Sequence, residues 1–356
     1  MIEKYYDGAI EQVAAGLGTV EKNHLLVRYS GQFSVENLND TKQLEKNEDI
    51  FVQVHEFETG EITCAYEPYL TMICDGFRRY MTGTFEEFME TCDVYYLHRP
   101  VLLGYFNQDN TGREEIILLD EVAYEQERML AALERMLCAI ADRHPVLFVL
   151  NRFQLASKST MQLTARFLKC ENCNIGLVLG VSDIQAMPEF LVPDWEMLYE
   201  TLDDGSKIYH IGNSGRKKEE TIDDEKYVDY GSEKVYRKLQ NMVEFLDFDQ
   251  AAYYLETIER KIKFDNLLVD DAARFRMWLL FVKVSILRQD IPKALEICED
   301  LEKIHLAGKE EEIRKALREC GCAALPTGVE IVNATEVVEI CDDPATAFKR
   351  KKDSSL

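Results

Sequence analysis

Positive charge is scarce in this sequence. The chain of 356 residues carries 41 lysine and arginine residues against 65 aspartate and glutamate residues, so its formal net charge is −24 at pH 7. A protein of that charge repels the phosphate groups of nucleic acid and of anionic lipid. The sequence therefore predicts no nucleic-acid partner. Two short basic runs, 216–218 and 349–352, are interpreted as a solvated loop and a solvated tail.

Long apolar runs are missing as well. No stretch approaches the roughly 20 apolar residues that span a bilayer, and no charged-then-apolar export segment opens the chain. These features predict a cytoplasmic protein with no membrane partner. In that compartment the ten cysteines are expected to be reduced thiols, not a disulfide framework.

Patterns for metal binding or nucleophilic catalysis are not found either. A zinc site needs four ligands, yet the pairs Cys170/Cys173 and Cys320/Cys322 are far apart and no histidine follows them at finger spacing. The six histidines are scattered, and none stands in a recognisable arrangement with a serine or cysteine nucleophile. The sequence predicts no metal site and no catalytic residue.

What the sequence does contain is the composition of a globular protein, with 46% apolar and 30% charged residues. Its length favours two domains. Apolar runs predict strands at 24–29, 50–54, 146–150, 175–180 and 208–211. Helical spacing of apolar residues predicts helices at 2–18, 67–80, 84–92, 122–143 and 159–169. This alternation predicts an α/β fold, a parallel sheet with helices on both faces.

The second part of the chain has the composition of a helical repeat. From Glu233 to about Cys320 helix-forming residues dominate. The segments Val243–Ala252 and Val284–Ala294 resemble each other, each reading as a helix end, a polar turn and an alanine-bearing helix start. Helix pairs with one apolar face stack on neighbours to bury it, so the recurrence predicts a small all-α solenoid that binds another protein.

The predicted division of the chain has four parts. They are an α/β domain over 1–211, a charged linker over 212–232, helical repeats over 233–322, and a strand-like segment with a basic tail over 323–356.

One part of the α/β segment resembles a known motif. The stretch from His144 to Gln154, followed by Ser159 and Thr160, is similar to the second nucleotide motif of the STAND class of signal-transduction ATPases. In that family an apolar strand precedes two acidic residues, an apolar residue and Gln or His. The resemblance implies an AAA-like, P-loop-NTPase-like domain over 1–211.

Three further segments extend the resemblance. Tyr66–Leu70 looks like the family's tyrosine-proline segment, and Leu177–Ser182 looks like its sensor strand. The family commonly joins its ATPase to tetratricopeptide-like arrays, and 277–296 is similar to such a repeat.

The residues that would hold and split ATP are replaced. A phosphate-binding loop needs Gly-x-x-x-x-Gly-Lys-Ser/Thr, and that pattern occurs nowhere; after the first strand only Gly31 remains. By the resemblance, Asn151 stands where the Mg²⁺-coordinating aspartate belongs and Arg152 where the water-activating acid belongs. A neutral amide is a poor Mg²⁺ ligand, and arginine accepts no proton. The degenerate nucleotide site then consists of Gly31, Asn151, Arg152, Gln154 and Ser182.

These observations lead to one expected function and two alternatives. We expect a non-catalytic signalling or scaffold protein, with a pseudo-ATPase domain and helical repeats that bind a protein, and with no bound cofactor. The first alternative is a switch that binds ATP or a related nucleotide weakly without hydrolysis. The second is an enzyme of unrelated chemistry, since fold does not determine function. A homo-oligomer is left open.

Overall fold

The computed structural model divides the chain into two compact units. The first contains a five-stranded sheet with helices α1 to α8, and the second contains helices α9 to α13. The structure describes residues 2–19, 24–29, 35, 49–58, 60–108, 122–170, 174–182, 187–203, 207–211, 229–304 and 309–323.

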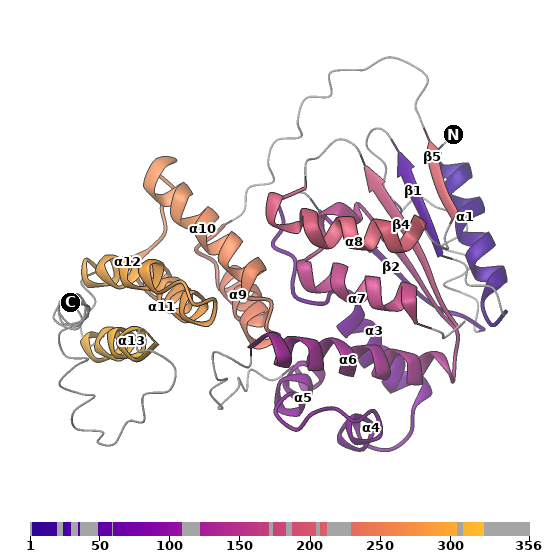
Figure 1. Ribbon diagram of the computed structural model, residues 1–356, viewed down its shortest axis with the longest axis horizontal. Helices are drawn as coiled ribbons and strands as arrows, with labels where there is room; N and C mark the ends of the chain where they lie inside the picture. Colours follow the sequence, from indigo (N-terminus) through magenta and orange to yellow (C-terminus); the bar gives the residue numbers. More distant parts are fainter. Residues whose placement is uncertain are drawn as a thin grey trace, which may run out of the picture. The chain divides into compact units, whose positions relative to one another are not determined.

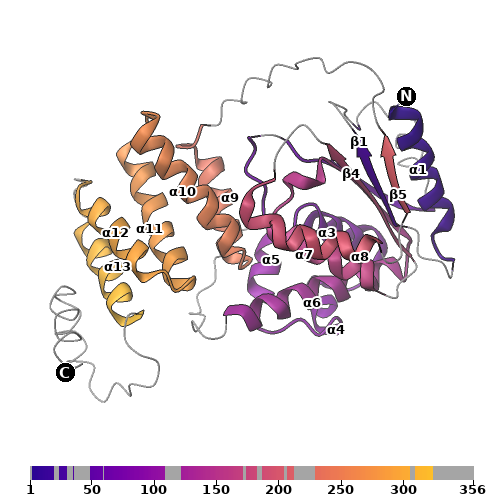
Figure 2. The same cartoon turned by 45° about the horizontal axis from the view of Figure 1, so that its top comes forward.

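The sheet of the first unit is entirely parallel. Its strands are β1 (His24–Tyr29), β2 (Phe51–Glu56), β3 (Val146–Asn151), β4 (Ile175–Ser182) and β5 (Lys207–Ile211). They lie in the order β2-β3-β4-β1-β5, and Figure 2 shows β1, β4 and β5 pointing the same way. The central strands β3 and β4 are almost wholly buried, as expected for parallel strands that are covered on both faces.

Helices cover both faces of this sheet. They are α1 (Ile2–Gly16), α3 (Tyr69–Tyr80), α4 (Phe85–Thr91), α5 (Arg99–Asn107), α6 (Val122–Ala141), α7 (Lys158–Lys169) and α8 (Val192–Asp203). Leu147 and Val149 of β3 pack in one buried cluster with α1. The ring of Phe148, which points to the other face, contacts Tyr69 of α3. Figure 1 shows α7 and α8 running side by side over the strands.

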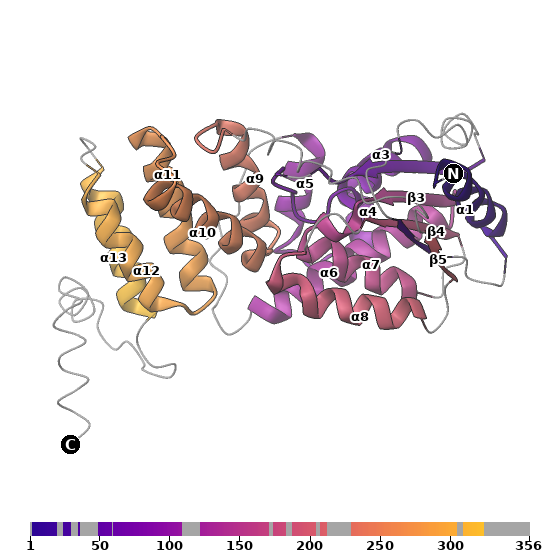
Figure 3. The ribbon, with the colours of Figure 1, turned by 90° about the horizontal axis from the view of Figure 1, so that it is seen from above.

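The second unit is a succession of helices. They are α9 (Glu233–Glu244), α10 (Phe248–Phe264), α11 (Asp271–Leu287), α12 (Ile291–Glu302) and α13 (Glu310–Ala323). Each packs on the next, from α9 to α13, as Figure 3 shows. Both faces of α11 are buried, with Phe275, Trp278 and Phe281 among its buried residues, because α9 and α10 contact it along with α12 and α13.

The turn that was expected to recur does so in matching geometry. After α9 the backbone N–H of Asp247 donates to the carbonyl of Met242, 2.8 Å away; after α11 Asp290 donates to Ser285 over the same distance. The residue before each aspartate has positive φ, 65° at Leu246 and 61° at Gln289. The interval from Asp247 to Asp290 is longer than the tetratricopeptide repeat of about 34 residues, so the tetratricopeptide assignment stays a prediction.

The coarse sequence predictions are confirmed. The parallel α/β sheet with helices on both faces and the helical region that follows are both present. Helices α5 and α8 were not predicted from the sequence. The strand-like segment predicted over 323–356, and most of the linker predicted over 212–232, lie outside the described residues. Within the described part of the chain, none of the helices has the length and apolar character needed to cross a bilayer.

Candidate functional site

The candidate site lies where the carboxyl ends of β1, β3 and β4 meet. Tyr29, the last residue of β1, is in register with Ser182, the last residue of β4. The strands β1 and β4 are neighbours in the sheet. The strand that follows β1 in the chain is β2, which lies on the far side of β3. The strand that follows β4 is β5, which lies on the far side of β1. In open α/β sheets ligands bind at such a reversal of strand order, outside the carboxyl ends.

A buried hydrogen bond crosses this point of the sheet. The hydroxyl of Tyr29 donates to the side-chain oxygen of Asn151 at 2.7 Å, from the end of β1 to the end of β3. Asn151 is 0% exposed and Tyr29 is 2% exposed. The amide oxygen that the resemblance places at the metal position is therefore engaged by a phenol of the same chain.

Gly180 of β4 makes this contact sterically feasible. A Cβ added to Gly180 would lie 2.3 Å from the Tyr6 hydroxyl and 2.6 Å from the Asn151 side-chain oxygen. Real Cβ atoms do not approach other atoms so closely, so any side chain here would displace both groups. The space above β4 is consequently filled by Tyr6, from α1, and by Asn151.

Burial raises the pKa of both phenols. It raises the pKa of Tyr29 to about 12, although the charge of Arg152 and the hydrogen bond with Asn151 act in the opposite direction. Burial raises the pKa of Tyr6 well above its ordinary value, and the nearby Tyr29 and Glu56 add to that effect. At neutral pH the two tyrosines are therefore hydrogen-bonding groups and carry no charge.

Arg152 follows β3 in a left-handed backbone conformation, with φ 53°. Its Nε lies 3.4 Å from the Oε1 of Glu56, the last residue of β2, and the two side chains are 25% and 17% exposed. The second carboxylate oxygen of Glu56 accepts a hydrogen bond of 3.1 Å from the backbone N–H of Val35. The single described carboxylate contacting Arg152 is thus shared with a backbone N–H from the segment after β1.

Both ends of the Gln154 side-chain amide form hydrogen bonds with the backbone of Ser182. Its Nε2 donates to the carbonyl of Ser182 at 3.1 Å, and the Ser182 N–H donates back to its Oε1 at 3.4 Å. Both residues are buried. This reciprocal pair ties the turn after β3 to the end of β4, so Ser182 and Gln154 hold the floor of the site together.

The segment that resembles the tyrosine-proline motif docks on the start of α7. The N–H of Tyr66, at φ 55°, donates to the hydroxyl of Ser159 at 3.0 Å. Thr160 donates from its hydroxyl to the carbonyl of Glu67 at 2.9 Å. Ser157 caps the helix by accepting from the Thr160 N–H. The hydroxyls of Ser157, Ser159 and Thr160 thus each form a hydrogen bond with a backbone group.

The structure therefore brings together four of the five sequence-predicted positions, Asn151, Arg152, Gln154 and Ser182. Gly31 lies outside the described residues. Sequence reasoning missed Tyr6, Tyr29 and Glu56. Strand ends were a usable signal for Tyr29 and Glu56, but only the strand order reveals that these ends adjoin.

The side chains described at the site offer hydrogen bonds and one ion pair, that of Arg152 with Glu56. Among the described residues, no group of three His, Cys, Asp or Glu side chains is placed to hold a metal ion. Asn151 supplies a neutral oxygen, and Glu56 faces a guanidinium. Phosphoryl transfer takes nearly all its acceleration from metal and positioned charge, so these side chains provide no mechanism for it.

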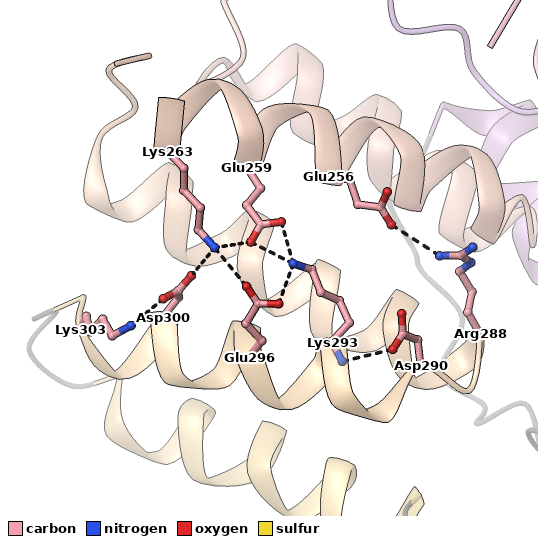
Figure 4. Close-up of polar contacts among 9 residues, drawn as sticks. All are labelled: Glu256, Glu259, Lys263, Arg288, Asp290, Lys293, Glu296, Asp300 and Lys303. Carbon is pink, nitrogen blue, oxygen red and sulfur yellow. Dashed lines mark hydrogen bonds and ion pairs between the residues drawn. The ribbon is translucent and has the colours of Figure 1, made fainter. Parts of the chain in front are cut away.

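The second unit carries a separate polar feature between α10 and α12 (Figure 4). The Nζ atoms of Lys263 and Lys293 lie 2.7 Å and 2.8 Å from carboxylate oxygens of Glu259, whose side chain is 8% exposed. Both lysines also contact Glu296, and Lys263 contacts Asp300. Lys303 contacts Asp300 in turn, so three lysines face three carboxylates and the cluster has no net charge, which favours a role in joining α10 to α12.

Comparison with known proteins assigns no family. No model of a known protein family matches the chain, and a search of the curated proteins finds no match.

Proposed function

We propose that this protein is a non-catalytic signalling or scaffold protein. Its α/β unit is a pseudo-ATPase domain of the STAND type over 1–211, and its tetratricopeptide-like repeats over 233–322 bind another protein. The proposal rests on the motif resemblance together with the geometry of the site. At the position of the metal ligand stands Asn151, whose side-chain oxygen accepts the Tyr29 hydroxyl.

The observation that carries the proposal is the filled space above Gly180. Tyr6 and Asn151 occupy the volume next to β4 at the reversal of strand order. A triphosphate with Mg²⁺ needs room, a lysine and acidic metal ligands in that place. The described side chains there include no lysine, and their one carboxylate, that of Glu56, faces Arg152. The hydrogen bonds that fill the site stabilise the fold.

The helical repeats support the protein-binding part of the proposal. Successive helix pairs present an extended surface, and such surfaces bind protein segments in other repeat proteins. Large apolar side chains lie exposed where α10 passes into α11, with Phe264 at 77% and Leu268 at 95% exposure. Exposed apolar groups of this size are frequent in protein interfaces.

Calorimetric titration and a hydrolysis assay test the proposal. The full chain, titrated with ATP and Mg²⁺, is expected to give no saturable heat and to release no phosphate above the buffer rate. Hydrolysis that Asn151→Ala abolishes would refute the proposal.

A weak nucleotide switch is the second candidate, and one observation favours it: Arg152 and the Val35 N–H, two donors of the kind that bind oxyanions, both contact Glu56 at the site. Saturable heat without hydrolysis would establish it.

A further inference from the structure

Glu56 is the point on which the positive groups of the candidate site converge. The backbone N–H of Val35 reaches one of its carboxylate oxygens at 3.1 Å. The Nε of Arg152 lies 3.4 Å from the other. The side chain of Glu56 is 17% exposed, so solvent reaches part of it.

These two donors are of the kind that bind phosphate. The backbone N–H of Val35, after β1, and the guanidinium of Arg152, after β3, are both well suited to an oxyanion. They meet beside the reversal of strand order, where ligands of such sheets bind. In this chain the oxyanion that they contact is a side chain.

We propose that Glu56 is a resident anion: it occupies a site for phosphate-class anions from within the chain and so excludes them. The proposal rests on the proposed function, because it explains how a nucleotide-like site is kept empty of nucleotide. It adds the ligand class that the site would accept and names the residue that blocks it.

The position of Glu56 makes it a strong competitor. It is in register with Asn151 in the parallel pair of β2 and β3, and the N–H of Phe57, directly after it, donates to the Asn151 carbonyl at 3.0 Å. Strand pairing therefore fixes the backbone of Glu56 beside the site. The carboxylate then has a high effective concentration there, which is an advantage over any anion that arrives from solution. Its charge, and the net charge of −24, also repel such an anion.

Other groups of the site are compatible with an anion once Glu56 is neutral. Burial raises the pKa of the Tyr29 phenol, and the positive charge of Arg152 acts on that phenol to lower its pKa. Neither Asn151 nor Gln154 adds negative charge. Among the described residues of the site, the carboxylate of Glu56 is thus the group whose removal leaves Arg152 as the charge.

The test compares two variants of the full chain that lose the same charge. Glu56→Gln keeps the size of the side chain, and Glu86→Gln removes a carboxylate from an exposed position on α4. Each is titrated with inorganic pyrophosphate by calorimetry at low ionic strength. We expect Glu56→Gln to bind at least about tenfold more tightly than the wild type and Glu86→Gln, through charge-assisted hydrogen bonds. Adding Arg152→Gln to Glu56→Gln is expected to abolish the gain.

Equal affinities of Glu56→Gln and Glu86→Gln would overturn the proposal. Thermal melting verifies that the variants are folded, and Glu56→Ala serves as the second variant if Glu56→Gln is not. The wild type gives an independent readout: its Val35 amide resonance is expected to stay unmoved by pyrophosphate, and a saturable shift would contradict the proposal. Binding of ATP with Mg²⁺ by the wild type refutes the proposed function; a silent wild type with a silent Glu56→Gln refutes only the resident anion.

Discussion

The hydroxyl of Tyr29 lies 2.7 Å from the side-chain oxygen of Asn151, although β4 separates the strands that carry them. The hydrogen bond is possible because the residue of β4 next to it is Gly180, which has no side chain. Three strand positions that are distant in sequence thus form one buried contact at the end of the sheet.

Removing the donor should weaken the first unit. Tyr29→Phe leaves the buried Asn151 oxygen without this hydroxyl, and we expect the free energy of unfolding to fall by about 1 to 3 kcal/mol. Urea denaturation followed by tryptophan fluorescence measures the loss. Tyr96→Phe, at a side chain that is 61% exposed, is the control and should change stability by less than about 0.5 kcal/mol. Equal effects of both variants would contradict the expectation.

Filling the space above β4 should be costly. Gly180→Ala introduces a Cβ 2.3 Å from the Tyr6 hydroxyl, so we expect a loss of about 1 to 3 kcal/mol from overpacking. Gly8→Ala is the matched control, because nothing lies within 4 Å of a Cβ there. Gly8 is inside α1, where alanine should add roughly 0.5 to 1 kcal/mol. The two variants should therefore move the thermal midpoint in opposite directions.

The buried phenol should make stability sensitive to alkali. Burial raises the pKa of Tyr29 from its ordinary value of 10.0 to about 12 in the folded chain. As the pH rises, the unfolded state therefore loses the phenol proton before the folded state does. The stabilising contribution is complete below pH 10 and is lost as the pH rises towards 12. By pH 11 the advantage of the wild type over Tyr29→Phe should shrink by about 1.4 kcal/mol relative to pH 9. An advantage that is independent of pH would contradict this assignment.

The cluster between α10 and α12 should stabilise the second unit. Glu259→Gln withdraws the carboxylate that both Lys263 and Lys293 contact, and its burial makes the loss larger than for a surface pair, about 1 to 3 kcal/mol. Glu311→Gln is the control, because its side chain is 70% exposed; its effect should stay under about 0.5 kcal/mol. Chemical denaturation followed by circular dichroism compares them. Similar losses would show that the buried position of Glu259 is irrelevant.

Two thiols of the first unit should be oxidised selectively. The Sγ atoms of Cys138, on α6, and Cys170, after α7, lie 3.4 Å apart, and both residues are half-buried. Diamide, which takes up the two protons and two electrons, should join them in a disulfide. The pair Cys298 and Cys320, at 3.9 Å, is buried and should stay reduced in the folded chain. Peptide mapping by mass spectrometry under non-reducing conditions distinguishes the pairs; cross-linking of the buried pair first would contradict the expectation.

Local patterns in the sequence were sufficient for the strands and for part of the site. The apolar runs 146–150 and 175–180 predicted buried strands, and strands form there as β3 (Val146–Asn151) and β4 (Ile175–Ser182), one and two residues longer than predicted. The motif around Asn151 also grouped Arg152, Gln154 and Ser182 into one site, and Gln154 and Ser182 are hydrogen-bonded to each other; that these residues form a degenerate nucleotide site stays a prediction. These inferences needed only the order of residues along one or two neighbouring elements.

The remaining parts depend on pairing between distant strands. Glu56 becomes part of the site because β2 pairs with β3, and Tyr29 reaches Asn151 because β1 and β3 are separated by β4 alone, which has Gly180 at this point. No local pattern encodes either arrangement. Helix α5 escaped detection because the consecutive apolar residues from Val101 to Leu103 mask a helical period in a short element.

The most direct test of the account is a crystal structure of the full chain grown with ATP and Mg²⁺. The account predicts that the Tyr29 hydroxyl still contacts Asn151, that Glu56 still accepts from Val35, and that no nucleotide is ordered at the ends of β1, β3 and β4. An ordered triphosphate with Mg²⁺ coordinated by Asn151 would contradict it.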